Sequence, residues 1–326
     1  MIVSKTPLRI SFFSGGSDTP TFYKREDGAA LSVTIDKFIH VIVRKTPNLP
    51  IKTMFDIVDE SDNIEDMKHI ISRESLKLFN IDSEITIASL SDIFSNGSGL
   101  GSSSAFTVGL VNSLFKLNDI GASKELIAKF ACDIEMDKCG YPVGKQDQYA
   151  ASYGGFNLLK FYNNQTVDVK KIKSENLSKL NDNLLLVHSG KGRIGNDFLQ
   201  KQSVAMMDDV KFNKVRQNRD LAFEGLNYIL SDDLDSFGDL LHQSWINKRQ
   251  IVSDITEDYL DNIYNIAKES GAIGGKILGA GGGGFFVFYV KEDKRECVIN
   301  SLKNKTNCKI FPFRFYDEGT KIMSYE

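Results

Sequence analysis

Cysteine and histidine are scarce in this chain of 326 residues, with four of each. The cysteines form no Cys-x-x-Cys pair, and the nearest histidines do not complete a zinc-binding pattern with them. We therefore expect reduced thiols, and neither a disulfide framework nor a zinc site. The histidines are scattered, which also disfavours a histidine-based catalytic triad. The residues are Cys132, Cys139, Cys297 and Cys308, and His40, His69, His188 and His242.

Long apolar runs and an excess of charge of one sign are absent as well. No segment approaches the roughly 20 apolar residues of a membrane-spanning helix, and the N-terminal residues lack the apolar core of a signal peptide. The net charge of −3 favours neither a nucleic acid nor a membrane surface as a partner. With 41% hydrophobic residues the chain can bury a large core, in one large domain or two smaller ones. We expect a cytoplasmic protein.

The pattern of apolar residues predicts an α+β fold. Helical spacing predicts helices over residues 64–79 and 123–138, and several more between about 195 and 270. The polar stretch 173–183 is the best candidate for a boundary between two lobes. In the first third of the chain, β-branched and aromatic runs predict strands over residues 7–13, 29–35, 38–45 and 51–58.

A glycine- and serine-rich stretch, "SNGSGLGSSSAF", stands directly before a strongly apolar segment. Val108, Val111 and Leu114 repeat there with helical period, and Leu110 and Leu117 cover other sides, so the expected helix is buried nearly all round. The first N–H groups of a helix have no partner within it, and a glycine-rich approach lets them reach a bound phosphate. A serine hydroxyl there can cap the helix or reach a magnesium ion. A plain capped loop explains the same residues, and a Walker A loop is excluded because no Gly-Lys-Ser/Thr follows.

Two further glycine turns adjoin apolar strands. Near the C-terminus, "GGKILGAGGGGFFVFYV" contains the spacing Gly-x-Gly-x-x-Gly at residues 279–284. A strand follows these glycines, whereas a dinucleotide-binding fingerprint needs a strand before and a helix after, so we reject that interpretation. Near the N-terminus, Arg9 lies in an apolar strand that runs into Gly15-Gly16 and Asp18. An arginine in such a strand usually needs a buried partner, which favours a functional role for it.

Three motifs in one order resemble those of the GHMP kinases: "TPLRISFFSGGSD" at residues 6–18, "GLGSSSA" at 99–105 and "KILGAGGGGFFVF" at 276–288. Within the family the sequence is most similar to sugar 1-kinases, above all to heptose 7-phosphate kinases, on "RISFFSGGSD", "GKQDQYAASYGGFN" and "GKILGAGGGGF". The resemblance implies a two-lobed α+β fold. The N-terminal lobe, residues 1–178, would be like the second domain of ribosomal protein S5, and the C-terminal lobe, residues 179–326, would be ferredoxin-like. ATP and the sugar would lie in the cleft between them.

The resemblance also assigns roles around the nucleotide. Asp147 corresponds to the catalytic aspartate of the family, and Arg9 is expected beside it. Ser103 (with Ser102 as the adjacent alternative) and Glu135 correspond to the Mg²⁺ ligands of mevalonate kinases, although those enzymes have one residue fewer between this glutamate and the aspartate. The phosphates of ATP are expected on the backbone of Gly97, Ser98, Gly99, Leu100, Gly101, Ser102, Ser103 and Ser104.

On the acceptor side, the resemblance indicates a sugar that already carries a phosphate. Asp18 matches an aspartate that binds sugar hydroxyls in galactokinases, and Gly15-Gly16 replaces their bulkier Glu-His, which leaves room for an anionic sugar. Lys145 looks like a one-residue insertion and adds positive charge near the expected base. On a further helix, Lys248 and Arg249 are additional candidates for the cleft. The expected acceptor-binding residues are Gly15, Gly16, Ser17, Asp18, Lys145, Lys191, Arg193, Gly281 and Gly282.

The implied activity is ATP-dependent phosphorylation of the anomeric hydroxyl of a heptose 7-phosphate, with Mg²⁺ as cofactor. Small molecules are the expected partners, without nucleic acid or membrane, and a homodimer is left open. One alternative is a fucose- or galactose-type 1-kinase that acts on a neutral hexose. Another is a non-catalytic sugar sensor on the same scaffold, against which the presence of Asp147, Arg9, Ser103 and Glu135 argues.

Overall fold

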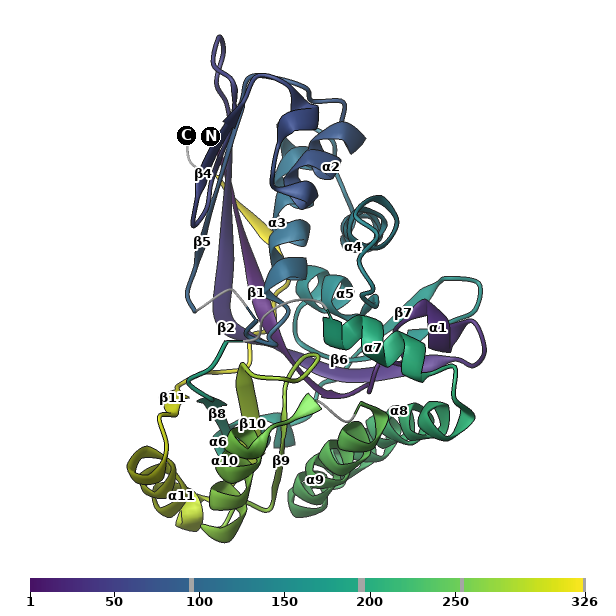
Figure 1. The fold of residues 1–326 in the computed structure, drawn as a ribbon, viewed down its shortest axis with the longest axis vertical. Coiled ribbons are helices and arrows are strands. Elements are labelled where there is room, and N and C mark those ends of the chain that lie inside the picture. The colour runs from purple at the N-terminus through teal and green to yellow at the C-terminus, as the bar shows by residue number, and fades with distance from the viewer. Residues whose placement is uncertain (94–96, 193–196, 253–254, 325–326) are drawn as a thin grey trace.

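Two β-sheets, each packed against helices, make up the computed structural model, which describes all residues except 94–96, 193–196, 253–254 and 325–326 (Figure 1). In the described residues the larger sheet has eight strands and the smaller sheet has four. The first and last strands of the chain pair with each other in the larger sheet, so the two termini lie side by side (Figure 1).

The larger sheet is built on two long antiparallel strands, β1 (Ile2–Phe13) and β2 (Gly28–Lys45). The sequence predicted two strands within β2, but the structure has one continuous strand whose pairing with β1 shifts between Pro7 and Leu8. Such an irregularity bends a strand without ending it, and the proline at this point has no N–H to donate. The strand order is β12-β1-β2-β5-β3-β4, and β6 pairs with β2 and β7. The remaining strands are β3 (Ile51–Met54), β4 (Val58–Ser61), β5 (Ile85–Ser91), β6 (Phe156–Phe161), β7 (Val167–Lys171) and β12 (Lys321–Ser324).

Helix α3 (Ser102–Leu117) lies directly on β1 and β2 and is buried along most of its length, as its apolar pattern predicted. The close approach depends on Gly109, because a Cβ there would lie 2.8 Å from Thr6 Oγ1 and 2.9 Å from Ser4 Oγ. The Ser4 hydroxyl donates to the Gly109 carbonyl instead. This packing fixes the start of α3 relative to β1. The neighbouring elements are α1 (Pro20–Tyr23), η1 (Ile64–Asp66), α2 (Ile70–Leu78), α4 (Lys124–Cys132), the π-helical turn η2 (Asp133–Lys138) and α5 (Gln146–Tyr153).

The smaller sheet is antiparallel and has the order β11-β8-β10-β9. Its central strands are entirely buried, and Trp245 is among the fully buried side chains beside them. The elements of this part are α6 (Asn176–Asn183), β8 (Leu184–His188), α7 (Asp197–Ala205), α8 (Asp209–Leu230), α9 (Leu234–Ile251), α10 (Asp258–Glu269), β9 (Gly274–Ile277), β10 (Phe285–Tyr289), α11 (Glu292–Lys305) and β11 (Lys309–Phe311).

The two sheets share one apolar core, so the lobes are not independent bodies. Phe12 of β1 stacks on Phe156 with 5.6 Å between ring centroids, and meets Phe237 of α9 edge-on at 5.3 Å. The expected lobe boundary after residue 178 falls inside α6. The chain also returns to the larger sheet at its end, where β12 pairs with β1, so the C-terminal strand belongs with the first lobe.

His69 caps α2 and is the basis of a pH prediction. Its Nδ1 accepts the Ser72 N–H at 3.2 Å, and its ring lies against Phe55 and Phe106. Burial lowers the pKa of His69 from 6.5 to about 4, so the unfolded chain takes up a proton here before the folded protein does. The stabilisation is therefore complete above pH 6.5 and is lost as the pH falls toward 4.

Relative to His69→Asn, which keeps a capping side chain, the wild type should lose about 2 kcal/mol of unfolding free energy between pH 7.5 and pH 5, measured by urea denaturation. Parallel pH dependences for the two proteins would contradict this assignment.

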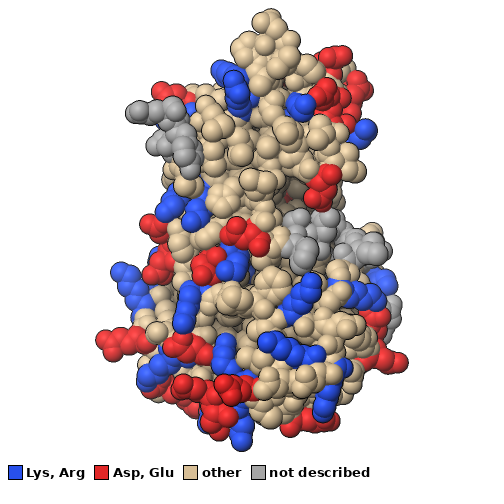
Figure 2. Space-filling model, turned by 90° about the vertical axis from the view of Figure 1, so that its left-hand side faces the viewer, with Lys and Arg blue, Asp and Glu red and all other residues tan. Residues whose placement is uncertain are grey.

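No helix in the described part of the chain is long and apolar enough to cross a membrane. On the face shown in Figure 2, lysine and arginine side chains are interspersed with aspartate and glutamate, most densely over the lower half. Such mixing produces no extended field of one sign on that face.

Candidate active site

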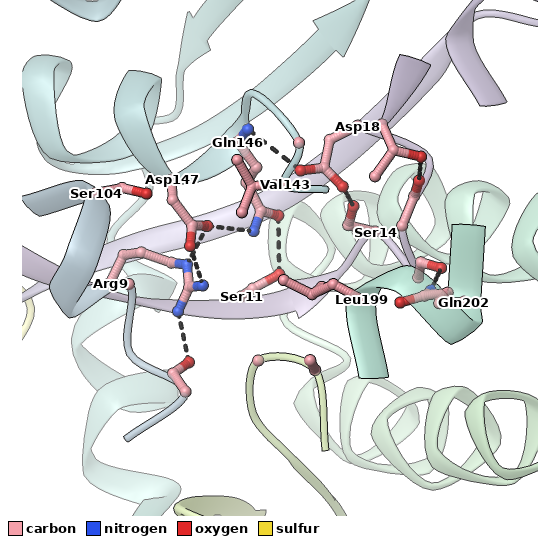
Figure 3. Close-up of a pocket in the computed structure, with 18 of the residues that line it drawn as sticks. Arg9, Ser11, Ser14, Asp18, Ser104, Val143, Gln146, Asp147, Leu199 and Gln202 are labelled. Atoms are coloured by element: carbon pink, nitrogen blue, oxygen red, sulfur yellow. Dashed lines mark hydrogen bonds and ion pairs between the residues drawn. The ribbon is translucent and has the colours of Figure 1, made fainter. Parts of the chain in front are cut away.

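A pocket of about 230 Å³ brings together the three glycine turns singled out in the sequence. The end of β1 and the turn after it form one wall, and the start of α3 forms another. The turn between β9 and β10 approaches from the smaller sheet. Figure 3 shows Arg9 and Ser11 of β1 pointing toward Asp147 and Gln146 of α5. Arg9 and Ala280, about 270 residues apart in sequence, thus line one site.

Arg9 and Asp147 face each other through two hydrogen bonds (Figure 3). Arg9 Nε donates to Asp147 Oδ1 at 2.7 Å, and Arg9 Nη2 donates to Oδ2 at 2.6 Å. The remaining guanidinium nitrogen, Nη1, donates to the Gly99 carbonyl at 2.7 Å. Arg9 is only 4% exposed, whereas the Asp147 side chain keeps 25% of its surface open. The bidentate pair therefore fixes both carboxylate oxygens while leaving them accessible from the pocket.

The turn before α3 presents backbone amides to the pocket. Gly97, Gly99 and Gly101 have φ values of 68°, 79° and 74°, a region that side chains rarely adopt. Gly101 is the N-cap of α3, and no side chain caps the helix. The serine cap, one of the interpretations that the sequence left open, is not formed: the Ser102 hydroxyl bonds to Ser98 Oγ at 2.8 Å instead. Without a side-chain cap, the first amides of α3 remain available to an anion, and the helix dipole favours one there.

The second and third glycine turns pack directly against each other. A Cβ on Gly99 would lie 2.5 Å from the Leu278 carbonyl oxygen, and a Cβ on Gly279 would lie 2.6 Å from Gly99 Cα. The Phe285 N–H donates to the Ser98 carbonyl at 3.0 Å. The smaller sheet thus supports the turn before α3 from behind, and glycine is required on both sides because the two backbones touch.

Gly99→Ala should weaken ATP binding strongly. The new methyl group would strain a positive-φ position and push against Leu278, which displaces the amides at the start of α3. We expect a rise of roughly 10-fold or more in the KM for ATP and a loss of about 2 kcal/mol of stability, measured by steady-state kinetics and thermal unfolding. Gly121→Ala is the matched control, because no atom lies within 4 Å of its added Cβ. Equal KM values for both variants would contradict the role of this turn.

Glu135 is buried beside the start of α3. It is 1% exposed and accepts hydrogen bonds from Ser104 Oγ at 2.7 Å, from Thr107 Oγ1 at 2.5 Å and from the amide of Gln148. Burial raises its pKa to about 7, against the opposing effect of these hydrogen bonds. The residue lies on η2, where the backbone departs from the α-helix expected over residues 123–138. π-helical turns are frequent at functional sites.

The oxygen groups near Glu135 fit a magnesium ion. Mg²⁺ is usually held by one or two protein oxygens together with phosphates and water, and Glu135 lines the pocket with the hydroxyl groups of Ser103 and Ser104. Ser104 is the serine in contact with Glu135, while Ser103 is exposed at the pocket wall. A carboxylate with a raised pKa gains from a neighbouring cation, since the cation favours its charged form.

The other end of the pocket is polar and closely hydrogen-bonded (Figure 3). Asp18 accepts from Ser14 Oγ at 3.1 Å and from the Gln146 N–H at 3.3 Å. Burial, and next the charge of Asp147, raises the pKa of Asp18. Gln146 connects the two halves of the site, because its Oε1 accepts from Ser11 Oγ at 2.8 Å and its Nε2 donates to Asp147 Oδ1 at 3.1 Å. Gly15 and Gly16 line the pocket beside these groups.

Several residues expected at the acceptor end do not line the pocket. The Ser17 hydroxyl is buried and donates to the Ala29 carbonyl, and the Lys145 amine donates to the Gln165 carbonyl at 2.7 Å. Lys191 pairs with Glu257 at the surface. Added Cβ atoms on Gly281 and Gly282 would meet Ile255 and Phe198 of α7. Gly279 and Ala280 line the pocket in their place. Arg193 lies outside the described residues.

The pocket also contains groups that the sequence analysis missed. Gln146 stands next to the expected base, and Asn218 and Gln202 come from helices with no recognised motif. Lys248, one of two additional candidates, lines the pocket, whereas Arg249 pairs with Asp261. Lys276 lies at the start of the third motif and was not considered. Its signal was visible, since a lysine between glycines and apolar strand residues needs a buried partner as much as Arg9 does.

Comparison with known protein families agrees with this geometry. The model for the GHMP kinases N terminal domain matches residues 64–155, and the model for the GHMP kinases C terminal domain matches residues 226–307. The chain belongs to the GHMP kinase family. The expected family and its two-lobed α+β fold are thus confirmed, and GHMP sugar kinases are phosphotransferases that use ATP and act on a sugar hydroxyl.

Individual relatives cover nearly the whole chain. The D-glycero-alpha-D-manno-heptose 7-phosphate kinase of Campylobacter jejuni subsp. jejuni serotype O:2 is 29% identical over 98% of both chains. A bifunctional fucokinase/GDP-fucose pyrophosphorylase of Arabidopsis thaliana is 23% identical over 89% of this chain and 30% of its own length. Among solved structures, a D-glycero-D-manno-heptose 1-phosphate kinase from Bacteroides thetaiotaomicron has a TM-score of 0.82 at 22% identity, over 100% of both chains. A putative sugar kinase from Campylobacter jejuni has a TM-score of 0.74 at 28% identity, over 99% of this chain and 98% of its own.

Proposed function

We propose that this GHMP kinase transfers the γ-phosphoryl group of ATP to the anomeric hydroxyl of D-glycero-D-manno-heptose 7-phosphate. The products are the 1,7-bisphosphate and ADP. The observation that carries the proposal is the Arg9–Asp147 pair, which opens into the pocket between the amides of the turn before α3 and the polar end around Asp18. A carboxylate held between a phosphate cradle and a sugar-sized polar recess is suited to activating a sugar hydroxyl.

The chemical step needs one proton acceptor and a fixed alignment. Asp147 accepts the proton of the anomeric hydroxyl while that oxygen bonds to the γ-phosphorus. The bond from the γ-phosphorus to the β–γ bridging oxygen breaks, and the electron pair leaves with ADP. Arg9 holds the carboxylate in place through both oxygens and adds positive charge next to the transferred group. The anomeric hydroxyl is more acidic than an ordinary alcohol, which suits a carboxylate base.

The residues around the start of α3 serve the nucleotide. The backbone of residues 97–104 holds the phosphates, as the exposed amides and the helix dipole favour. Glu135 and Ser103, with Ser104 between them, would hold Mg²⁺, which when bound neutralises phosphate charge and orients the triphosphate. The three hydrogen bonds to Glu135 position its carboxylate for that purpose.

A phosphorylated heptose is favoured over a neutral hexose by the relatives and by the pocket. The Campylobacter jejuni relative is named for a heptose 7-phosphate and aligns over almost its full length, whereas the fucokinase relative aligns over 30% of its length. Gly15 and Gly16 themselves add no bulky or acidic side chain to the acceptor end. A product with phosphates at both ends suits later activation of the heptose with a nucleotide, for the synthesis of surface polysaccharide. The use of ATP favours the cytoplasm as the location of the reaction.

A panel of acceptors tests the proposal. ADP release is measured with ATP and Mg²⁺ against D-glycero-D-manno-heptose 7-phosphate, the same heptose without its phosphate, galactose and fucose. We expect kcat/KM for the heptose phosphate to exceed that for every neutral sugar by roughly 100-fold or more. Equal or faster turnover of a neutral hexose would replace the proposed acceptor, and binding of sugar without any turnover would favour the sensor.

A further inference from the structure

Four buried hydrogen-bond donors line the pocket from the smaller sheet and from helices α8 and α9. Asn218 comes from α8, Ser244 and Lys248 come from α9, and Lys276 comes from β9. Their exposed fractions are 0%, 1%, 5% and 5%, and all four line the pocket. None of them belongs to the Arg9–Asp147 pair or to the turn before α3.

Two of these groups have a donor that the protein itself does not use. Asn218 Nδ2 and Ser244 Oγ are buried and have no hydrogen-bond partner among the described residues. The orientation of Asn218 follows from its Oδ1, which accepts from Asn247 Nδ2 at 3.5 Å. An unsatisfied buried donor costs free energy, so its retention on a pocket wall indicates a ligand that accepts hydrogen bonds.

The two lysines add positive charge to the same wall. Lys276 Nζ donates to the Phe12 carbonyl at 2.6 Å, and no carboxylate of the described residues forms an ion pair with it. Burial and next the charge of Arg9 lower the pKa of Lys276 to about 7. Lys248 Nζ donates to the carbonyls of Ile277 and Gly279, so it lies beside the same strand. The buried ammonium group of Lys276, whose printed hydrogen bond goes to a neutral carbonyl, gains from an anionic ligand.

The four groups line one pocket, and their contacts show which elements carry them there. Ser244 and Lys248 are one helical turn apart on the same face of α9. A Cβ on Gly15 would lie 2.5 Å from Asn218 Cβ, so α8 meets the turn after β1 there. Lys276 reaches β1 at Phe12, which is three residues, or about 10 Å of strand, from Arg9.

We propose that Asn218, Ser244, Lys248 and Lys276 form an anion subsite that binds the phosphate which the acceptor sugar already carries. The inference rests on the proposed function and adds to it the residues that recognise a phosphorylated sugar. The two ammonium groups, the amide and the hydroxyl can each donate a hydrogen bond to a phosphate oxygen. None of the four groups is a carboxylate, which would repel the phosphate. The transferred phosphate is assigned to the amides of the turn before α3, so the subsite would bind a different phosphate group in the same pocket.

Two substitutions test the subsite, each with a matched control. Lys276→Met removes the charge and keeps the length of the side chain, and Ser244→Ala removes one hydroxyl. Lys268→Met is the control for the first, because the Lys268 amine also bonds to a backbone carbonyl, that of Ile273, but outside the pocket. Ser113→Ala is the control for the second, since Ser113 Oγ is likewise buried and without a partner among the described residues, in the body of α3. Thermal unfolding and the KM for ATP confirm that each variant is folded.

The measured quantity is the KM for heptose 7-phosphate relative to that for the same heptose without its phosphate. Lys276→Met should raise the KM for heptose 7-phosphate roughly 10- to 100-fold and leave the KM for the unphosphorylated heptose within about 2-fold. Ser244→Ala should cause a smaller rise that is also confined to the phosphorylated sugar. The two controls should leave both constants unchanged. If the KM values for the phosphorylated and neutral sugars rise together, or neither rises, the subsite is wrong.

Binding of inorganic phosphate separates this inference from the proposed function. Should the enzyme phosphorylate no sugar phosphate, the proposed acceptor fails, but the subsite is still tested by titrating phosphate calorimetrically into the enzyme saturated with ADP and Mg²⁺. Binding by the wild type that weakens roughly 10-fold or more in Lys276→Met, and not in Lys268→Met, would support an anion subsite at this wall. Absent binding, or equal binding by both variants, would overturn it.

Discussion

Asp147→Asn should lower kcat roughly 10²- to 10⁴-fold, the usual contribution of a positioned general base. The amide retains the shape of the side chain but cannot accept the proton of the sugar hydroxyl. Arg9 keeps its hydrogen bond to Gly99 and one acceptor on the new side chain, so the pocket should stay assembled. Initial rates with saturating ATP and heptose phosphate measure the effect.

The control for this prediction is a carboxylate outside the pocket. Asp168 is exposed and accepts from Tyr162, so Asp168→Asn should retain full activity. Calorimetry should show that Asp147→Asn still binds ATP, because the amides before α3 are untouched. A variant that keeps more than about a tenth of the wild-type kcat would show that Asp147 is not the base.

Glu135→Gln should make the protein more stable and much less active. The unfolded chain ionises Glu135 near pH 4.5, whereas burial raises the pKa of the folded group to about 7. Its contribution to stability is therefore present below pH 4.5 and is lost as the pH rises through 7. At pH 8 in metal-free buffer, the variant should exceed the wild type by about 3 kcal/mol of unfolding free energy, and this gain should disappear near pH 4.5.

The amide can satisfy the hydrogen bonds of the buried carboxylate. Its oxygen can accept from Ser104 and Gln148, and its NH₂ group can donate to Thr107, whose hydroxyl already reaches the Ser103 carbonyl at 3.1 Å. Loss of the charge should weaken Mg²⁺ and lower activity roughly 10- to 100-fold. Urea denaturation and the Mg²⁺ dependence of the initial rate are the measurements. Unchanged Mg²⁺ dependence would remove Glu135 from the proposed metal site, and lower stability at pH 8 would contradict the raised pKa.

The sequence was informative where a residue type can be accommodated in only a few structural settings. An arginine within an apolar strand needs a buried anionic partner, and the structure provides one in Asp147. Glycines that precede an apolar helix predict an open helix start, and the positive φ values there require glycine. Helix α3 follows from a uniformly apolar segment, whereas the sequence divided the long strand β2 into two strands.

The sequence was less informative where the direction of a side chain decides its role. Lys145 stands two residues from Asp147, but its amine lies on the Gln165 carbonyl because the chain enters α5 between them. Gly281 and Gly282 resemble pocket glycines in sequence, yet they face Ile255 and Phe198. The spacing of residues along the sequence does not determine in which direction these residues point. The donors on α8 and α9 carry no motif at all, and only tertiary packing brings them to the pocket.

Product analysis by phosphorus NMR tests the central claim most directly. The enzyme is incubated with ATP, Mg²⁺ and D-glycero-D-manno-heptose 7-phosphate, and the proton-coupled phosphorus spectrum is followed over time. The account predicts a new phosphate signal split by a single anomeric proton, growing in step with ADP while the original sugar phosphate signal persists. Formation of inorganic phosphate alone, or a new phosphate ester on any carbon other than the anomeric one, would contradict it.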